Sequence, residues 1–239
     1  MIHFDVITVF PEIISQYAAL SIIGRAQKQG AVTITAHDLR QWATDKHRTV
    51  DDRVYGGAAG MLMKVEPIYR AISELQAKAK QRAQVIATDA SGILFSQKLA
   101  HTFASRTQDS AHYILLCGHY EGFDARVYEF VDYKLAVGPY IVTGGELPAL
   151  IIIDAVTRLL PGVLGNNASA VEETEFTFEN EKLLVTNEHP QYTTPASFTF
   201  TDSSGTLQTR EVPPILRSGH HKKIADVNKS QRVKKTLTL

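Results

Sequence analysis

Three glycine-rich segments of the sequence are candidates for a ligand-binding site. They cover residues 54–62, 117–124 and 137–150, and we interpret all three as lying just after strands. Glycine lets backbone groups approach a bound molecule closely, and ligands of open α/β sheets collect beyond the carboxyl ends of the strands. A single segment of this kind is as often a tight turn between two elements as part of a ligand site, but three of them favour a ligand site. None matches the GxGxxG or Walker pattern, which disfavours nucleotide hydrolysis and the common dinucleotide fold.

The elements around these segments indicate an α/β domain with a mainly parallel sheet, because short β-branched runs alternate with helical patterns. The expected strands are 4–10, 32–36, 85–88, 113–117 and 133–137. The expected helices are 11–29, 66–80, 96–105, 124–130 and 146–160.

The chain has 239 residues, which is enough for one domain and a small appendage. After Pro161 the sequence GVLGNNASA is small and polar and indicates a linker. We therefore divide the chain into a ligand-binding domain (1–161), a linker (162–174) and a C-terminal domain (175–239). In the last, 197–201 and 206–212 predict a hairpin, and 219–239 a basic helix.

The composition excludes several classes of protein. With 44% hydrophobic and 21% charged residues, the chain is neither disordered nor a coiled coil. No apolar run reaches the ~20 residues of a membrane span, and the first residues lack a signal-peptide pattern, so we expect a cytoplasmic protein without membrane association. The single Cys117 forms neither an intrachain disulfide nor a Cys-rich zinc site, and we expect no structural metal.

Charge is distributed unevenly although the formal net charge is zero. Residues 210–239 hold eight Lys or Arg against two acids, whereas 171–188 hold six Glu against one Lys. A basic end of this kind fits contact with phosphates, although solvated surface is the commoner explanation.

Four longer motifs occur in a fixed order. They are HRTVDDRVYGGAAGMLM (47–63), CGHYEGFDARV (117–127), GPYIVTGGELPALIIIDAVTRLLPGVLG (138–165) and EVPPILRSGHH (211–221). Over nearly its whole length the chain resembles the bacterial tRNA (guanine-37-N1)-methyltransferases, the TrmD family. The resemblance implies a SPOUT-type fold with a deep trefoil knot and a small, mostly helical C-terminal domain that grips tRNA. It also implies S-adenosylmethionine as methyl donor, S-adenosylhomocysteine as product, and a homodimer with its active site between protomers.

The resemblance assigns binding roles to particular residues. Those expected to line the cofactor are Ala87, Thr88, Gly118, Tyr120, Glu121, Gly122, Val137, Gly138, Pro139, Tyr140, Ile141, Val142, Gly144, Gly145, Leu147 and Pro148. Those expected to contact tRNA are Asp51, Arg53, Arg217, His220, Lys222 and Lys223. The expected substrate is a tRNA with guanosine at the last anticodon position and at the next position 3′.

The expected catalytic groups follow from the chemistry of guanine. Its N1 carries a proton that a base must remove, and the resulting negative charge is shared with O6, where a cation stabilises the transition state. The resemblance implies Arg158 as that cation, with Asp154 one helical turn earlier to orient it. The same spacing also fits an ordinary surface ion pair. The base would be Glu173 of the other protomer, where the family has an aspartate.

Several positions depart from the family pattern. His119 stands in place of an arginine, Pro139 in place of an aspartate, and Asp89 and Ala90 in place of Ser-Pro. The hairpin region is also longer than usual. The family requires magnesium, but no cluster of ligands identifies a site; Glu121 and Glu173 are the first acids to inspect. Two alternatives stay open: an RNA-binding protein with weakened catalysis, and another knotted methyltransferase that acts on a ribose 2′-hydroxyl.

Overall fold

The computed structural model describes residues 1–106, 111–164, 175–179, 182–186, 189–232 and 234–237. The chain divides into two compact units, Met1–Asn167 and Ala168–Leu239. Most of the predicted linker, residues 165–174, lies outside the described residues, so its bounds stay a prediction. Within the described residues, no helix has the length and apolar character needed to cross a bilayer.

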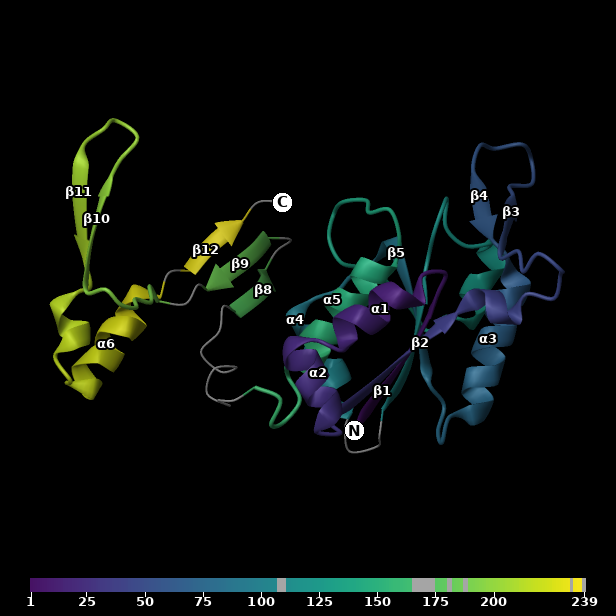
Figure 1. The fold of residues 1–239 in the computed structure, drawn as a ribbon, viewed down its shortest axis with the longest axis horizontal. Coiled ribbons are helices and arrows are strands. Elements are labelled where there is room, and N and C mark those ends of the chain that lie inside the picture. The colour runs from purple at the N-terminus through teal and green to yellow at the C-terminus, as the bar shows by residue number, and fades with distance from the viewer. Residues whose placement is uncertain (107–110, 165–174, 180–181, 187–188, 233, 238–239) are drawn as a thin grey trace. The chain divides into compact units, whose positions relative to one another are not determined.

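A five-stranded parallel sheet forms the centre of the first unit (Figure 1). Across the sheet the strands are β2 (Val32–Asp38), β1 (Ile2–Thr8), β6 (His112–Cys117), β5 (Gln84–Leu94) and β7 (Tyr133–Ala136), and each pairs with its neighbour in parallel. The predicted mainly parallel sheet is confirmed, with all five strands. The prediction ended β5 at Thr88, which is where its register with β7 shifts; pairing resumes at Ile93.

The helices of the first unit are α1 (Pro11–Ala18), α2 (Ser21–Lys28), α3 (Val65–Lys78), α4 (Gln97–Ala104) and α5 (Glu146–Thr157). The single helix predicted for 11–29 is wrong, because the chain is extended at Leu20 and Ser21 has a positive φ of 49°. Residues 124–130 form a 3-10 helix, η3 (Ala125–Phe130), and another, η1 (Leu39–Trp42), follows β2. A short hairpin of β3 (Asp51–Arg53) and β4 (Met61–Met63), which the sequence did not predict, frames the first glycine segment.

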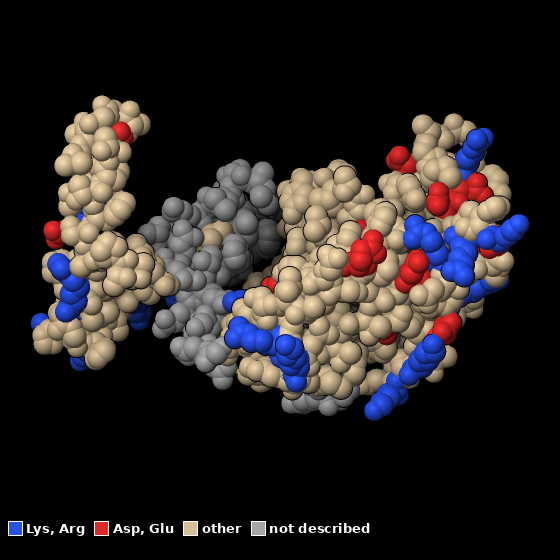
Figure 2. Space-filling view, viewed as in Figure 1, with Lys and Arg blue, Asp and Glu red and all other residues tan. Residues whose placement is uncertain are grey.

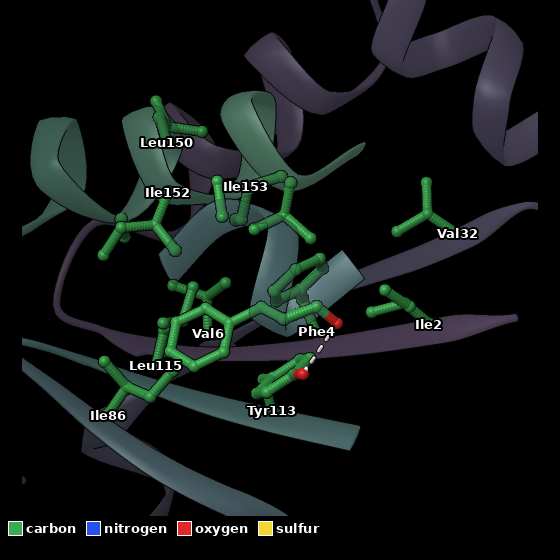
Figure 3. Packing of buried hydrophobic residues seen from close by; sticks show 14 of the residues in the cluster. Ile2, Phe4, Val6, Val32, Ile86, Tyr113, Leu115, Leu150, Ile152 and Ile153 are labelled. Carbon is green, nitrogen blue, oxygen red and sulfur yellow. Dashed lines mark hydrogen bonds between the residues drawn. The ribbon is translucent and has the colours of Figure 1, made fainter. Parts of the chain in front are cut away.

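Each face of the sheet has its own core, because side chains alternate between the faces along a strand. On one face Phe4, Leu115 and Ile86 pack against α1, α2, α4 and α5; Figure 3 shows Ile152 and Ile153 of α5 over these strands. On the other face Ile114 and its neighbours pack against α3. Both cores consist of hydrophobic residues, and the first of them holds α5 against the sheet.

The second unit contains more strand than helix in its described residues. A three-stranded antiparallel sheet has the order β12 (Lys234–Leu237), β9 (Lys182–Thr186), β8 (Glu175–Glu179). The predicted hairpin is confirmed as β10 (Ser197–Thr201) and β11 (Leu207–Glu211), followed by η5 (Pro214–Arg217). The basic helix is shorter than predicted: α6 spans His221–Gln231, and the chain after it pairs with β9. The expectation of a mostly helical unit therefore does not describe these residues. Part of the stretch predicted to be helical, Lys234–Leu237, pairs with β9 as a strand.

Candidate functional site

A cavity of about 440 Å³ lies at the carboxyl ends of β6 and β7, beside the middle of β5 where its register shifts. It is lined by residues 88–91, 118–123, 135–138 and 140–145, together with Tyr128 and Pro148. Its volume is typical of a small-molecule site. The second and third glycine segments meet here, as their places after parallel strands predict.

Most of the residues expected at the cofactor do lie together around this cavity. Those that line it are Thr88, Gly118, Tyr120, Glu121, Gly122, Val137, Gly138, Tyr140, Ile141, Val142, Gly144, Gly145 and Pro148. Three do not line it: Ala87 is fully buried in the sheet, while Pro139 and Leu147 are exposed. Because Pro139 lies outside the lining, its missing N–H does not remove a donor from the cavity wall.

A buried network that the sequence did not predict joins two walls of the cavity. Glu146, the first residue of α5, is 3% exposed and accepts a short hydrogen bond from the Thr8 hydroxyl at the end of β1. The Nε2 atom of His119 lies 2.7 Å from Oε2 and 2.9 Å from Oε1 of the same carboxylate. The one sign of this network in the sequence is that Glu146 is an acid at the start of an apolar helix. Its partner Thr8 is 138 residues away in the chain, so the sequence does not predict the contact.

The backbone around this network is packed too closely for larger residues. The Gly145 N–H donates to the Gly118 carbonyl at 2.8 Å, and His119 pairs with Gly144 in an isolated antiparallel bridge. A Cβ atom at Gly145 would lie 2.2 Å from Thr88 Oγ1 and 2.6 Å from backbone atoms of Cys117 and Gly118. These glycines therefore let the start of α5 lie directly on the strand ends.

A second polar group, at Asp89, lies in the middle of β5, where the register of this strand with β7 shifts. Asp89 accepts a short hydrogen bond from the Tyr128 hydroxyl and two bonds of 2.7 Å from the N–H and hydroxyl of Ser91. Burial acts to raise the pKa of Asp89, but these hydrogen bonds outweigh it and lower the pKa below its usual value. The Asp89 side chain thus stays an anion on the cavity wall.

Cys117 ends β6 directly before the cavity but is not a nucleophile. It is buried, and burial raises the pKa of its thiol well above the ordinary value, so the sulfur stays protonated. Within the described residues there is no group of three His, Cys, Asp or Glu side chains that could hold a metal ion. Glu121 lines the cavity and is exposed, and it belongs to no such group among the described residues.

Of the expected catalytic residues, Arg158 and Asp154 lie among the described residues, and neither lines this cavity. Arg158 is the C-cap residue directly after α5, twelve positions after Glu146, which is about 18 Å along a helix axis. Asp154 accepts a hydrogen bond of 2.7 Å from the Tyr17 hydroxyl of α1, which raises the pKa of Tyr17. Glu173 lies outside the described residues.

The expected tRNA-binding residues fall into two groups. Asp51 and Arg53 are on β3, whose partner β4 is tied to the cavity loop through bonds from Met63 N–H to the Gly122 carbonyl and from Glu121 N–H to the Met61 carbonyl. Neither residue lines the cavity itself. In the second unit, Arg217, His220, Lys222 and Lys223 lie on η5 and at the start of α6, where Figure 2 shows Lys and Arg side chains at the surface.

A parallel α/β sheet with a glycine-lined cavity at its strand ends defines a protein that binds a small ligand there. The model of the family described as tRNA (Guanine-1)-methyltransferase TrmD matches residues 2–239. The chain belongs to this family.

Individual relatives agree with that assignment. A protein of Chloroflexus aggregans named tRNA (guanine-N(1)-)-methyltransferase is 44% identical over 98% of this chain and 84% of its own length. One of the same name from Dictyoglomus turgidum is 42% identical, covering 99% and 87%. The crystal structure of tRNA (m1G37) methyltransferase from Aquifex aeolicus matches with a TM-score of 0.72 and 34% identity, over 95% of this chain and 87% of that one.

Proposed function

We propose that this protein is a tRNA (guanine-N1)-methyltransferase that transfers a methyl group from S-adenosylmethionine to N1 of guanosine 37, the nucleotide 3′ of the anticodon. One observation carries the proposal: thirteen of the sixteen residues expected to bind the cofactor line one cavity, in a chain that belongs to the family. The two alternatives, a binding protein without catalysis and a ribose methyltransferase, become outcomes of the tests below.

The cavity fits the proposed cofactor in shape and in chemistry. Glycines supply backbone groups that a ligand can approach closely, and Leu135, Ile141 and Pro148 provide apolar surface for a purine ring. The carboxylates of Asp89 and Glu121 favour a ligand with positive charge. When bound, S-adenosylmethionine supplies an electrophilic methyl group, and alignment of the guanine with that group is the protein's main task.

Two side chains complete the mechanism. In the proposal the carboxylate of Glu173 takes the N1 proton of guanine, and the guanidinium of Arg158 holds the negative charge that develops on O6. The resemblance places Glu173 alone on the partner protomer. Because Arg158 is about 18 Å along α5 from the residue that starts the helix at the cavity, we depart from that expectation for Arg158 and assign it to the partner of the protomer whose cavity is used as well. The proposed site therefore needs two chains.

The surface of the first unit supports a homodimer. Leu147, Ile151, Asp154 and Arg158 follow one another at helical spacings of four, three and four, so they share a face of α5. Leu147 is 59% and Ile151 45% exposed, and on α1, which contacts α5 through Tyr17, Ile13 is also exposed. Two such faces that pack around a twofold axis near Ile151 would run antiparallel. Each Arg158 would then approach the Leu147 end of the partner's helix, close to the partner's cavity.

The remaining features are inferred from the family. We propose that the chain carries the SPOUT trefoil knot, that its C-terminal domain begins near residue 175, and that it acts in the cytoplasm, where tRNA is used. A magnesium requirement is also inferred; its test is the methylation rate with and without a chelator.

The first experiment measures transfer of labelled methyl to tRNA transcripts. A transcript with guanosine at the last anticodon position and at the next position 3′ should be labelled, and one with adenosine at the second of these should not. Label in both transcripts, or in neither, contradicts the proposed function. Label resistant to the change but sensitive to a blocked ribose 2′-hydroxyl supports the ribose methyltransferase.

The second experiment tests the assignment of Arg158 to the partner. Arg158→Ala should lower the single-turnover rate by roughly 10²-fold while cofactor affinity stays near that of the wild type. Val142→Trp should fill the cavity and abolish cofactor binding. Mixing the two variants should restore activity, because the hybrid dimer keeps one intact cavity opposite one intact Arg158. If the mixture stays inactive although hybrid dimers form, Arg158 does not act across the interface.

A further inference from the structure

The hairpin of the second unit exposes two aromatic rings on one face. Phe198 and Phe200 are two residues apart on β10, so their side chains project from the same side of the strand. Their ring centroids are 5.9 Å apart and their planes differ by only 16°. Phe198 is 58% and Phe200 36% exposed, although the pair is stacked. Adjacent exposed aromatic rings of this kind indicate a surface that binds something.

The neighbours of these rings on β11 are polar and basic. Phe198 faces Arg210 and Phe200 faces Gln208 in the antiparallel register, and residues that face each other share a side of the hairpin. The Arg210 guanidinium donates to the Gln208 side-chain oxygen at 3.3 Å, and Gln208 in turn donates to Asp202 in the turn at 3.1 Å. The aromatic face, defined as Phe198, Phe200, Gln208 and Arg210, thus combines two rings with a positioned cation.

The charges near the base of the hairpin are mostly positive. Glu211 ends β11, and Arg217 of η5 lies 3.9 Å from its carboxylate. Lys222 and Lys223 follow on α6, so the described residues 189–232 hold six Lys or Arg against three Asp or Glu. A surface with exposed aromatic rings and surplus positive charge fits a polyanion whose units carry flat rings. Single-stranded RNA has both properties, because its bases stack on aromatic side chains and its phosphates pair with cations.

We propose that the aromatic face binds unpaired nucleotides of the substrate tRNA, with bases stacked on Phe198 and Phe200 and a phosphate near Arg210. The proposal rests on the proposed function only in taking tRNA as the RNA that is bound. The face supplies affinity for tRNA outside the cavity and takes no part in the transfer of the methyl group. Stacking of this kind tolerates any base, so the face adds grip without adding a sequence requirement.

The first test is the affinity of the full-length protein for tRNA. The Phe198→Ala, Phe200→Ala double variant should bind at least about tenfold more weakly, the loss expected for one base–aromatic stack. Leu207→Ala is the matched control: Leu207 is 71% exposed on the same hairpin but alternates to the opposite face, and its removal should leave the affinity unchanged. Arg210→Gln should reduce the slope of log affinity against log salt by about 0.7–0.9, the value for one phosphate contact.

A double variant with leucine at both positions separates stacking from simple apolar contact. Leucine keeps an apolar side chain but offers no flat ring, so binding should be as weak as with alanine. If the leucine variant binds tRNA like the wild type, bases do not stack on these rings and the proposal is wrong. A change in oligomeric state of the alanine variant, seen by sedimentation, would also assign the face to protein association.

A fluorescent reporter tests the contact without truncating either ring. Phe198→Trp in a Trp42→Phe background places a single indole on the hairpin, because Trp42 is the one tryptophan of the chain. Stacking of a base should quench its emission when tRNA or a short single-stranded oligonucleotide is added. Unchanged emission at saturating tRNA overturns the proposal. Quenching without methylation of the transcript would instead leave the aromatic face standing and remove the proposed function, so the two failures are distinguishable.

Discussion

Glutamine in place of Glu146 should destabilise the first unit and loosen the cavity. The variant keeps the shape of the side chain but replaces an acceptor oxygen with an NH2 donor and removes the charge. In the wild type, Thr8 and His119 both hydrogen-bond to the carboxylate, and the Thr8 hydroxyl is itself an acceptor for the Phe10 N–H at 2.9 Å. The added donor therefore meets groups whose arrangement is already set by other bonds.

The size of the effect follows from burial. Glu146 is 3% exposed, and hydrogen bonds to a charged group contribute ~1.5–3 kcal/mol each. Weakening two of them should lower the free energy of unfolding by roughly 2–4 kcal/mol. For a domain of this size that is a fall in Tm of about 4–16 °C. Cofactor affinity should fall too, because His119 and Glu146 connect the loops on two sides of the cavity.

The measurement is urea unfolding of the wild type, Glu146→Gln, His119→Gln and the double variant. If the two side chains act together, the double variant should lose less than the sum of the single losses, by about 0.5–3 kcal/mol. Glu129→Gln, an exposed acid of η3, is the control and should change stability by less than ~0.5 kcal/mol. Additive losses, or a Glu146→Gln protein as stable as the control, would refute the reasoning.

Two further predictions concern the sheet and the start of α5. Burial acts to raise the pKa of Asp5, but hydrogen bonds from His112 and His37, at 2.6 and 2.7 Å, outweigh it and hold the pKa well below its usual range. A depressed folded pKa gives stability that is fully present above the unfolded pKa of ~4 and declines as the pH falls from there toward the folded pKa. Asp5→Asn should therefore be most destabilising at pH 7 and progressively less so as the pH falls from about 4 toward 2; an equal loss at pH 7 and pH 2, by urea unfolding, contradicts this. Gly145→Ala should reduce the free energy of unfolding by ~1–3 kcal/mol and weaken cofactor binding measured calorimetrically, since its Cβ would meet Thr88 and the β6 backbone. Wild-type affinity in that variant would show that the contact relaxes at no cost.

The strands and the cavity could be predicted because their signals are local. Val85 to Ala87 and Tyr113 to Cys117 are short apolar runs that the parallel sheet buries on both faces. The carboxyl ends of parallel strands necessarily meet at one edge, so glycine segments that follow β6 and β7 must lie together there. Neither step required a long-range contact to be known.

The features that escaped prediction depend on partners distant in sequence. The single helix expected for 11–29 breaks near Leu20, where helical patterning continues but the backbone turns. The chain after α6 becomes a strand because β9 is available to pair with it. In the sequence, Glu146 is only an acid near the start of an apolar helix. Its role depends on contacts with Thr8 and His119, which the sequence does not show.

The difference between local and long-range signals also applies to the proposed site. One chain determines the cavity, but it does not determine on which protomer Arg158 acts. The cavity is made of loops that adjoin strands of a single sheet, so one chain holds all of its lining together. Arg158 is connected to that cavity only along α5, which begins at the cavity and runs away from the strand ends, so Arg158 lies at the far end of the helix. A motif can identify such a residue, but its spacing gives the position along the helix and not the protomer on which it acts. In the proposed dimer, the exposed Leu147 and Ile151 form the contact through which the Arg158 of one protomer reaches the cavity of the other.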